Sequence, residues 1–204
     1  MPTRRRASRF TSWLAVMITT AAIAACGSAD PAAGPLRMQT VGGQPVIATS
    51  FIAVVPGQTA DAEAYLDNDA NAPVRITAVS AVSAPGFATA RLVDVGVATS
   101  GHGLATARGW PPPVPSRPAI GADLPHGDIG LFFGITGPAV SHNYAVAGLK
   151  IAYTYQGQHY SLVAWAGATA CVAANPDSAS SYQSCSAYTT SVNTTVEKLA
   201  GLST

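Results

Sequence analysis

Three cysteines are the residues of this chain whose side-chain chemistry depends most on their surroundings. A thiol can form a thioether or a disulfide, and the cellular compartment and the neighbouring residues decide which one forms. Cys26 directly follows an apolar run near the N-terminus, whereas Cys171 and Cys185 lie 14 residues apart in the C-terminal part of the 204-residue chain. We therefore interpret Cys26 separately from the other two.

The segment before Cys26 has the pattern of an export signal. Four arginines precede position 10, and residues 13–25 form an apolar run that two threonines interrupt. The arginines stay on the cytoplasmic side while the apolar run enters the membrane. The run has about 13 residues, fewer than the roughly 20 that a helix needs to cross a bilayer core. We predict that residues 1–25 are a signal peptide for general secretion.

The motif Ile-Ala-Ala-Cys-Gly at residues 23–27 resembles the lipobox of bacterial lipoproteins. The resemblance implies that Cys26 receives a diacylglyceryl group, that a signal peptidase cuts just before it, and that membrane lipid holds the mature protein on the extracytoplasmic side of the cell membrane. Two or more acyl chains give stable anchoring, which one chain does not. The alternatives are an A-x-A-type cut that leaves Cys26 a plain thiol, or a Cys26 discarded with the signal peptide.

The other two cysteines form an even pair, and such a pair in an exported protein is expected to be oxidised. A disulfide between Cys171 and Cys185 would close a small loop, which the chain-entropy model values at about 3 kcal/mol. Redox-active pairs are usually spaced as C-x-x-C, unlike this one. We predict a structural disulfide, with two free thiols or a redox pair as the alternatives.

Composition excludes two classes of protein. Only 10% of the residues are charged and 48% are hydrophobic, which is incompatible with an intrinsically disordered chain. Nucleic-acid binding needs a clustered cationic surface, but the chain without residues 1–25 has seven basic against 10 acidic residues. We therefore expect a folded protein without a nucleic-acid partner.

Short apolar or alternating runs begin at about position 46 and are separated by Gly, Pro, Asn and Asp. Such runs predict β-strands, and Gln156-Gly157-Gln158 predicts a hairpin link. The predicted strands cover residues 46–55, 61–66, 74–79, 88–97, 129–135, 144–155 and 159–172. About seven strands with no convincing helix among them predict an all-β protein, an antiparallel β-sandwich over residues 46–174.

Three further segments have distinct compositions. Residues 26–45 are predicted to be the lipidated cysteine and a flexible tether, because they are rich in Ala, Gly and Pro. Residues 175–204 are predicted to be a disulfide-closed, Ser/Thr-rich loop and tail, in which residues 194–202 could form a short helix. Residues 99–126 contain Trp110 and three following prolines. We expect this segment to be extended and to cross between the sheets with Trp110 packed on the edge, rather than to be a ligand for a polyproline-binding partner.

One polar cluster is a candidate metal site. It contains Asp123, His126 and Asp128, which His102 or His142 could in principle join to hold a metal ion. The same stretch is rich in the Asp, Pro and Gly that form turns. We expect a hydrated loop before a strand, and no bound metal.

Aromatic residues flank the predicted hairpin link at Gly157. They are Tyr153, Tyr155, His159 and Tyr160. Aromatic side chains at hairpin ends commonly pack in cross-strand pairs. We expect such packing here, and an aromatic binding surface is the alternative.

Two family resemblances bear on the fold. Residues 61–79, followed by the pattern G-L-x-x-x-Y-x-Y-x-G-x-x-Y from Gly148 to Tyr160, resemble small immunoglobulin-like domains of lipoproteins in high-GC actinobacteria. Residues 62–80 are more distantly similar to the start of periplasmic copper-chaperone sandwiches, which bind Cu(I) through soft Met and His ligands. Met38 is the only methionine of the mature chain, and Phe132 and Phe133 occupy positions where such proteins would place metal ligands. The resemblances imply a shared architecture and not a shared metal site.

The sequence favours a membrane-anchored extracytoplasmic lipoprotein that acts as a non-catalytic binding or structural module, without a cofactor. An envelope protein or a glycan is the expected kind of partner. The sequence has no H-E-x-x-H, G-x-S-x-G or S-x-x-K motif of hydrolytic enzymes, and a hydrolase would need a Ser, a His and an acid from separate loops. The alternative is a periplasmic, copper-chaperone-like metal-handling protein that uses the His and Asp residues of the polar cluster.

Overall fold

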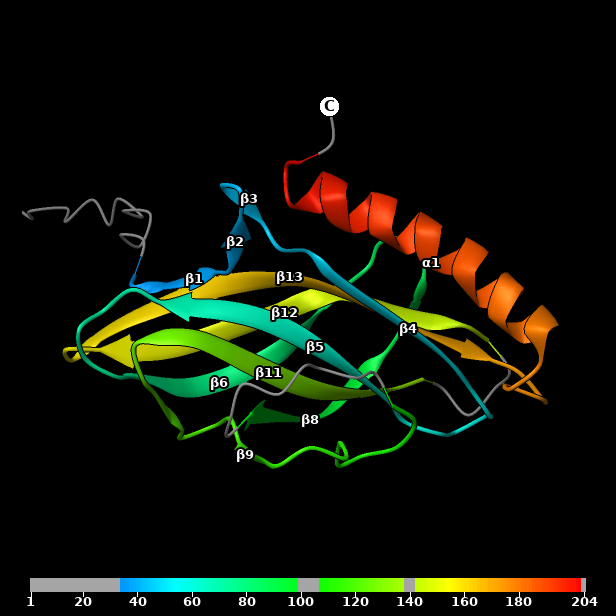
Figure 1. Cartoon of the computed structure of the whole chain (residues 1–204), viewed down its shortest axis with the longest axis horizontal. Coiled ribbons are helices and arrows are strands. Elements are labelled where there is room, and N and C mark those ends of the chain that lie inside the picture. The colour runs from blue at the N-terminus through cyan, green and yellow to red at the C-terminus, as the bar shows by residue number, and fades with distance from the viewer. Residues whose placement is uncertain (1–33, 99–106, 138–141, 203–204) are drawn as a thin grey trace, which may run out of the picture.

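The computed structural model describes residues 34–98, 107–137 and 142–202 as two β-sheets packed face to face with one helix (Figure 1). Seven long strands form the frame: β4 (Ala48–Val54), β5 (Ala60–Asn68), β6 (Val74–Ser83), β8 (Arg91–Ala98), β11 (Gly127–Thr136), β12 (Tyr144–Tyr155) and β13 (Gln158–Val172). The short strands are β1 (Leu36–Met38), β2 (Thr40–Val41), β3 (Gln44–Pro45), β7 (Ala88–Thr89), β9 (Ser116–Pro118) and β10 (Asp123–Leu124).

The strand order identifies the type of sandwich. The first sheet has the order β1-β5-β11-β8-β9 and the second β10-β6-β12-β13-β4, while β2 and β3 form a separate hairpin. An immunoglobulin domain pairs strands B, E and D in one sheet and C, F and G in the other. The orders β5-β11-β8 and β6-β12-β13 reproduce that arrangement, so the predicted immunoglobulin-like β-sandwich of about seven strands is confirmed. One long pairing is parallel, and it joins β4 to β13 at the edge of the second sheet.

The core lies between the two sheets and follows from the period-two patterns of the strands. In β5 the residues Ala60, Ala62, Ala64 and Leu66 face the core, so the alternate side chains lie on the outer surface of the first sheet. Large apolar side chains of β11, beside β5 in the first sheet, and of β12, in the facing sheet, fill the rest of this space and are fully buried. Each such side chain contributes roughly 1.5–3 kcal/mol through its removal from water.

The hairpin between β12 and β13 is confirmed. Tyr155 pairs with Gln158, so Gln156 and Gly157 form a two-residue turn, and both have positive φ values of 48° and 76°. Positive φ at both positions is typical of the type I′ turn that suits the twist of a hairpin. The turn keeps two long strands, β12 and β13, in fixed register at the centre of the second sheet.

Strand structure begins earlier in the chain than predicted. Residues 36–45 fall in the predicted tether, but Leu36–Met38 form β1, which pairs antiparallel with the end of β5. Leu36 is buried, and its backbone N–H donates to the Tyr153 hydroxyl at 3.3 Å. A three-residue strand is too short to show a period in the sequence, so only its tertiary pairing identifies it.

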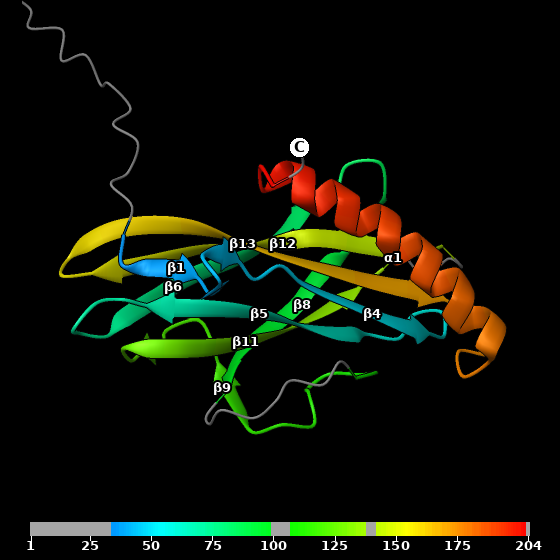
Figure 2. The ribbon, with the colours of Figure 1, turned by 45° about the horizontal axis from the view of Figure 1, so that its top comes forward.

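A helix replaces most of the predicted C-terminal loop and tail. α1 (Ala179–Leu199) has 21 residues, far more than the short helix expected over residues 194–202, and Ser178 caps its first turn by accepting the Ser181 N–H. Its buried side chains are Cys185, Thr189, Val192 and Val196, at the spacing of one helical face. Two of these four positions are not strongly apolar, and this concealed the helix in the sequence. Figure 2 shows α1 lying across β13 and β4, on the outer face of the second sheet.

The long connection crosses between the sheets as predicted. β9 extends the edge of the first sheet by pairing with β8, and β10 then pairs with β6 at the edge of the second sheet. The expected position of Trp110 on a sheet edge is wrong: its ring packs over the outer face of β11, an inner strand of the first sheet, where a Cβ added to Gly134 would lie 2.8 Å from it. No helix in the described part of the chain combines the length and the hydropathy that a membrane span requires.

Candidate functional site

The predicted disulfide between Cys171 and Cys185 is confirmed. Cys171 lies near the end of β13 and Cys185 lies on the buried face of α1, with their Cα atoms 5.4 Å apart. Both residues are buried. A disulfide shielded from solvent is poorly placed for exchange with other thiols, so this bond serves to hold the helix against the second sheet.

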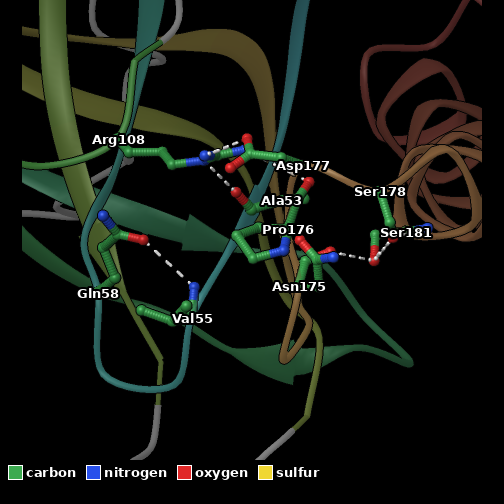
Figure 3. A network of polar contacts seen from close by, with 9 residues as sticks. All are labelled: Ala53, Val55, Gln58, Arg108, Asn175, Pro176, Asp177, Ser178 and Ser181. Carbon is green, nitrogen blue, oxygen red and sulfur yellow. Dashed lines mark hydrogen bonds and ion pairs between the residues drawn. The ribbon is translucent and has the colours of Figure 1, made fainter.

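Arg108 joins three segments that are distant in the sequence (Figure 3). Its Nε donates to the carbonyl oxygen of Ala53 in β4 at 2.7 Å, and its Nη1 lies 2.6 Å from Oδ1 of Asp177. Its Nη2 also donates to the carbonyl oxygen of Pro176 at 3.3 Å. A guanidinium group has five donors in a fixed plane and can make such contacts together. The arrangement ties the crossing segment to β4 and to the start of α1.

Two buried carboxyl groups lie near the Arg108 contacts, on the outer surface of β5. Asp61 and Glu63 are almost fully buried, at 2% and 6% exposure. Asp61 Oδ1 accepts the Ala107 N–H, and Tyr65 donates its hydroxyl to Glu63 Oε2 at 3.2 Å. The remaining oxygens, Asp61 Oδ2 and Glu63 Oε1, have no hydrogen-bond partner within the described ranges.

Burial controls the protonation of these two acids. It raises the pKa of Asp61 from 3.8 to about 6, against the opposing effect of the Ala107 N–H. It also raises the pKa of Glu63, to which the nearby charge of Asp61 adds. Desolvation disfavours the charged form of a carboxyl group. The pair therefore makes this side of the sandwich sensitive to pH.

The candidate metal ligands are only partly brought together. Asp128 lies beside Asp67 on the first sheet. Burial raises the pKa of Asp67, the hydrogen bond and charge of Asp128 raise it further, and the nearby His126 opposes this effect. Asp123 lies on the second sheet instead and forms an ion pair with Arg75, at 3.5 Å.

The histidines are far apart. His126 precedes β11 and its Nδ1 lies 3.1 Å from the carbonyl oxygen of Ala70, whereas His142 follows the other end of that strand. Ten residues of extended chain span about 33 Å, so these two histidines cannot share an ion. His102 lies outside the described residues. Among residues 34–98, 107–137 and 142–202, no three His, Cys, Asp or Glu side chains are grouped as metal ligands.

The aromatic residues of the hairpin pack against each other, as expected. Tyr153 and Tyr160 are direct cross-strand partners, and their rings stack with centroids 5.5 Å apart. Tyr153 is fully buried, and Tyr155 and Tyr160 pack partly against the core, which leaves His159 exposed. These side chains stabilise the hairpin.

The candidate binding surface is an open groove between β6 and β8, which the sequence did not single out. It has a volume of about 460 Å³ and is lined by Val79, Ser80, Ala81, Ala90, Arg91, Leu92, Val93, Asp94, Val95 and Ile120. Val93 and Ile120 are 43% and 61% exposed at its rim. The bottom of the groove is formed by Val79 and Leu92, which are partly buried and pack against the core.

The groove lies where two strand edges have no neighbour. Within the described residues, the crossing segment bonds to the edge of β6 only from Val74 to Ile76 and to the edge of β8 only from Val95 to Ala98. The Arg91–Asp94 part of β8 therefore carries no second strand within the described residues. An unpaired edge beside apolar side chains can accept another extended chain, which adds a strand to the sheet.

Comparison with known proteins adds a weak likeness to two solved structures. No protein-family model and no curated protein matches the chain. The chain is similar to an ASH/PapD-like domain of human CEP192, with 11% identity, a TM-score of 0.37, and coverage of 84% of this chain and 99% of that one. It is also similar to the CooA pilin subunit of enterotoxigenic Escherichia coli, with 12% identity, a TM-score of 0.34, and coverage of 68% and 99%. The fold assignment rests on the strand order and not on these likenesses.

Proposed function

We propose that this protein is an exported lipoprotein, held by an acylated Cys26 on the extracytoplasmic side of the cell membrane, whose sandwich acts as a non-catalytic binding or structural module. The observation that supports export is the buried Cys171–Cys185 disulfide. Such bonds form and persist in oxidising compartments and are rare in the cytosol. Export agrees with the basic and apolar N-terminal segment and with the lipobox-like motif that ends it.

The distance from Cys26 to the folded domain favours a position close to the membrane. Gly34, where the described chain begins, is the eighth residue after Cys26, and eight extended residues reach at most about 29 Å. β1 follows directly and pairs with the Asn68 end of β5. The domain would therefore approach the lipid surface with this end of the sandwich.

The groove lies toward the opposite end. Asn68 pairs with Gly127 at the start of β11, whereas Arg91 of the groove pairs with Thr136 at the end of β11. The length of β11, about 33 Å, separates the two positions. The groove of an anchored module is thus well separated from its tethered end and stays open to a partner.

Replacement of the acylated cysteine tests this proposal. Cys26→Ala should abolish acylation and leave an unprocessed precursor, because alanine has no thiol to receive lipid. Mass spectrometry of the N-terminus and membrane fractionation would show both effects, and Ser28→Ala, two residues on, should be processed and anchored normally. Normal processing of the Cys26→Ala protein, or native protein found unacylated in the culture supernatant, would contradict the proposal.

A further inference from the structure

The free edge of β8 carries an unusual arrangement of charges. Arg91 pairs with Thr136 and Asp94 pairs with Gly134, while the register between β8 and β11 shifts in between. Thr136 and Gly134 are two residues apart and so lie on the same face of β11. Arg91 and Asp94 therefore share a face, although side chains three residues apart in a regular strand point to opposite faces. The extra residue of this β-bulge is Val93.

Neither charge is neutralised by an ion pair. Asp94 Oδ1 accepts the backbone N–H of Val95 at 2.8 Å, and the ion pairs found within the described residues involve neither Asp94 nor Arg91. Both side chains are exposed at the rim of the groove, on either side of the exposed Val93. The edge thus presents a base, an apolar side chain and an acid in a row.

This order of side chains is complementary to itself. When two identical strands run antiparallel about a two-fold axis between Leu92 and Val93, Arg91 of each copy lies opposite Asp94 of the other. A two-fold interface uses the same surface on both subunits, so each contact occurs twice. Val93 of each copy then lies next to the axis, opposite Leu92 of the other copy, and the exposed apolar rim of each groove is covered. Opposite charges across neighbouring strands are favourable, and like charges are not.

We propose that two copies of this chain associate through the Arg91–Asp94 edge of β8, with their β8 strands antiparallel. A second copy satisfies both charges of the edge at once. An unrelated extended peptide would need an acid and a base at matching positions to do the same. Antiparallel β8 strands place the tethered β1 ends of the two copies at opposite ends of the dimer, and both ends reach one membrane when the strands lie along its surface. The interface does not depend on Cys26, so it can be tested separately from the proposed function.

Cysteine cross-linking in the intact membrane tests the geometry. Val93→Cys places a thiol next to the two-fold axis, near its counterpart in the other copy, and the full-length protein should form a disulfide-linked dimer on a non-reducing gel. Val41→Cys is the matched control, because Val41 is also an exposed valine, at 72%, but lies on the β2–β3 hairpin. A Val93→Cys protein that stays monomeric, that links to a protein of another mass, or that dimerises no more than Val41→Cys would overturn the proposal.

Charge reversal in the Val93→Cys protein tests the pairing. Arg91→Asp gives an edge with two acids, and Asp94→Arg gives an edge with two bases, so each variant alone should lose about tenfold or more of the cross-linked dimer. Co-expression of the two variants should restore the dimer as a mixed pair, and the double variant Arg91→Asp/Asp94→Arg should restore it with itself. Unchanged dimer in either single variant, or no recovery in the mixture, would show that these charges do not meet.

Discussion

At the scale of single residues, Asp61 shows how burial in the folded protein decides the charge of a carboxyl group. Alternation in β5 places this side chain outside the core, yet it is buried, and one carboxylate oxygen has no hydrogen-bond partner within the described residues. Because burial raises its pKa to about 6, the folded protein holds the proton more tightly than the unfolded chain does. The stabilisation is fully present below about pH 4 and is lost as the pH rises to about 6.

Replacement of Asp61 by asparagine should remove most of this dependence. The amide oxygen of Asp61→Asn can still accept the Ala107 N–H, but the side chain has no proton to lose. The titration of Asp61 should lower the free energy of unfolding of the native protein by about 2 kcal/mol between pH 4 and 6, and the variant should retain only the smaller slope that Glu63 and Asp67 produce. Urea unfolding at a series of pH values measures both slopes.

An exposed acid provides the control for this experiment. Glu197 lies on the exposed side of α1, so Glu197→Gln should keep the native pH profile. An Asp61→Asn protein whose stability still falls as steeply as that of the native protein would show that Asp61 is not the group that titrates.

At the scale of elements, the packing of β12 against β13 explains a glycine in the sequence pattern from Gly148 to Tyr160. The register between the two strands shifts between Val146 and Gly148. A Cβ at Gly148 would collide with the carbonyl oxygen of Ala164 and would lie 3.1 Å from the backbone nitrogen of Ala166. Backbone atoms of a central strand cannot move without loss of ladder hydrogen bonds, so only glycine fits.

Gly148→Ala should therefore destabilise the protein by about 3 kcal/mol, at the upper end of the usual cost of overpacking. Gly167→Ala is the control on the partner strand, because its new Cβ would meet only side-chain methyl groups of Thr49 and Val196, at 3.2 Å. Its loss should be about 1 kcal/mol or less. Thermal and urea unfolding compare the two variants, and equal losses would argue against the backbone collision.

At the scale of the whole molecule, the C-terminal helix depends on its covalent link to the sandwich. The buried face of α1 contributes two valines besides Cys185 and Thr189, and Tyr182 and Tyr188 add ring contacts with Phe51 and Phe87, which is a limited apolar area for 21 residues. Several threonine hydroxyls of α1 donate to the carbonyl oxygen four residues before them, which satisfies these groups without adding contacts to the sheet. The disulfide adds a covalent attachment of α1 to the sheet beside this limited packing.

Removal of the disulfide should loosen α1 first. The double variant Cys171→Ala/Cys185→Ala should lose about 3 kcal/mol of stability, as expected for a loop of this length. Hydrogen exchange should accelerate in α1 more than in β12, because the helix is a peripheral layer and β12 is a central strand. Ser186→Ala, next to the bond on the exposed side of the helix, should leave both measurements unchanged. Equal acceleration in α1 and β12 would show that the bond stabilises the sandwich as a whole.

The sequence by itself determined the strands, the hairpin and the disulfide, because these depend on local pattern and on the pairing of two cysteines. Period-two alternation identifies strands such as β5 and β6, and the Gly157 turn joins two of them. The crossing of residues 116–124 between the sheets also followed from their composition.

Only the tertiary structure decided which strand edges stay open and which side chains are covered. β1 exists because β5 offers it an edge, and α1 packs with a face that is half polar because the sheet lies beneath it. The candidate groove arises between β6 and β8, whose pairing partners leave part of each edge unoccupied. Contacts of this kind join residues that are far apart in the chain, so no local pattern of the sequence specifies them.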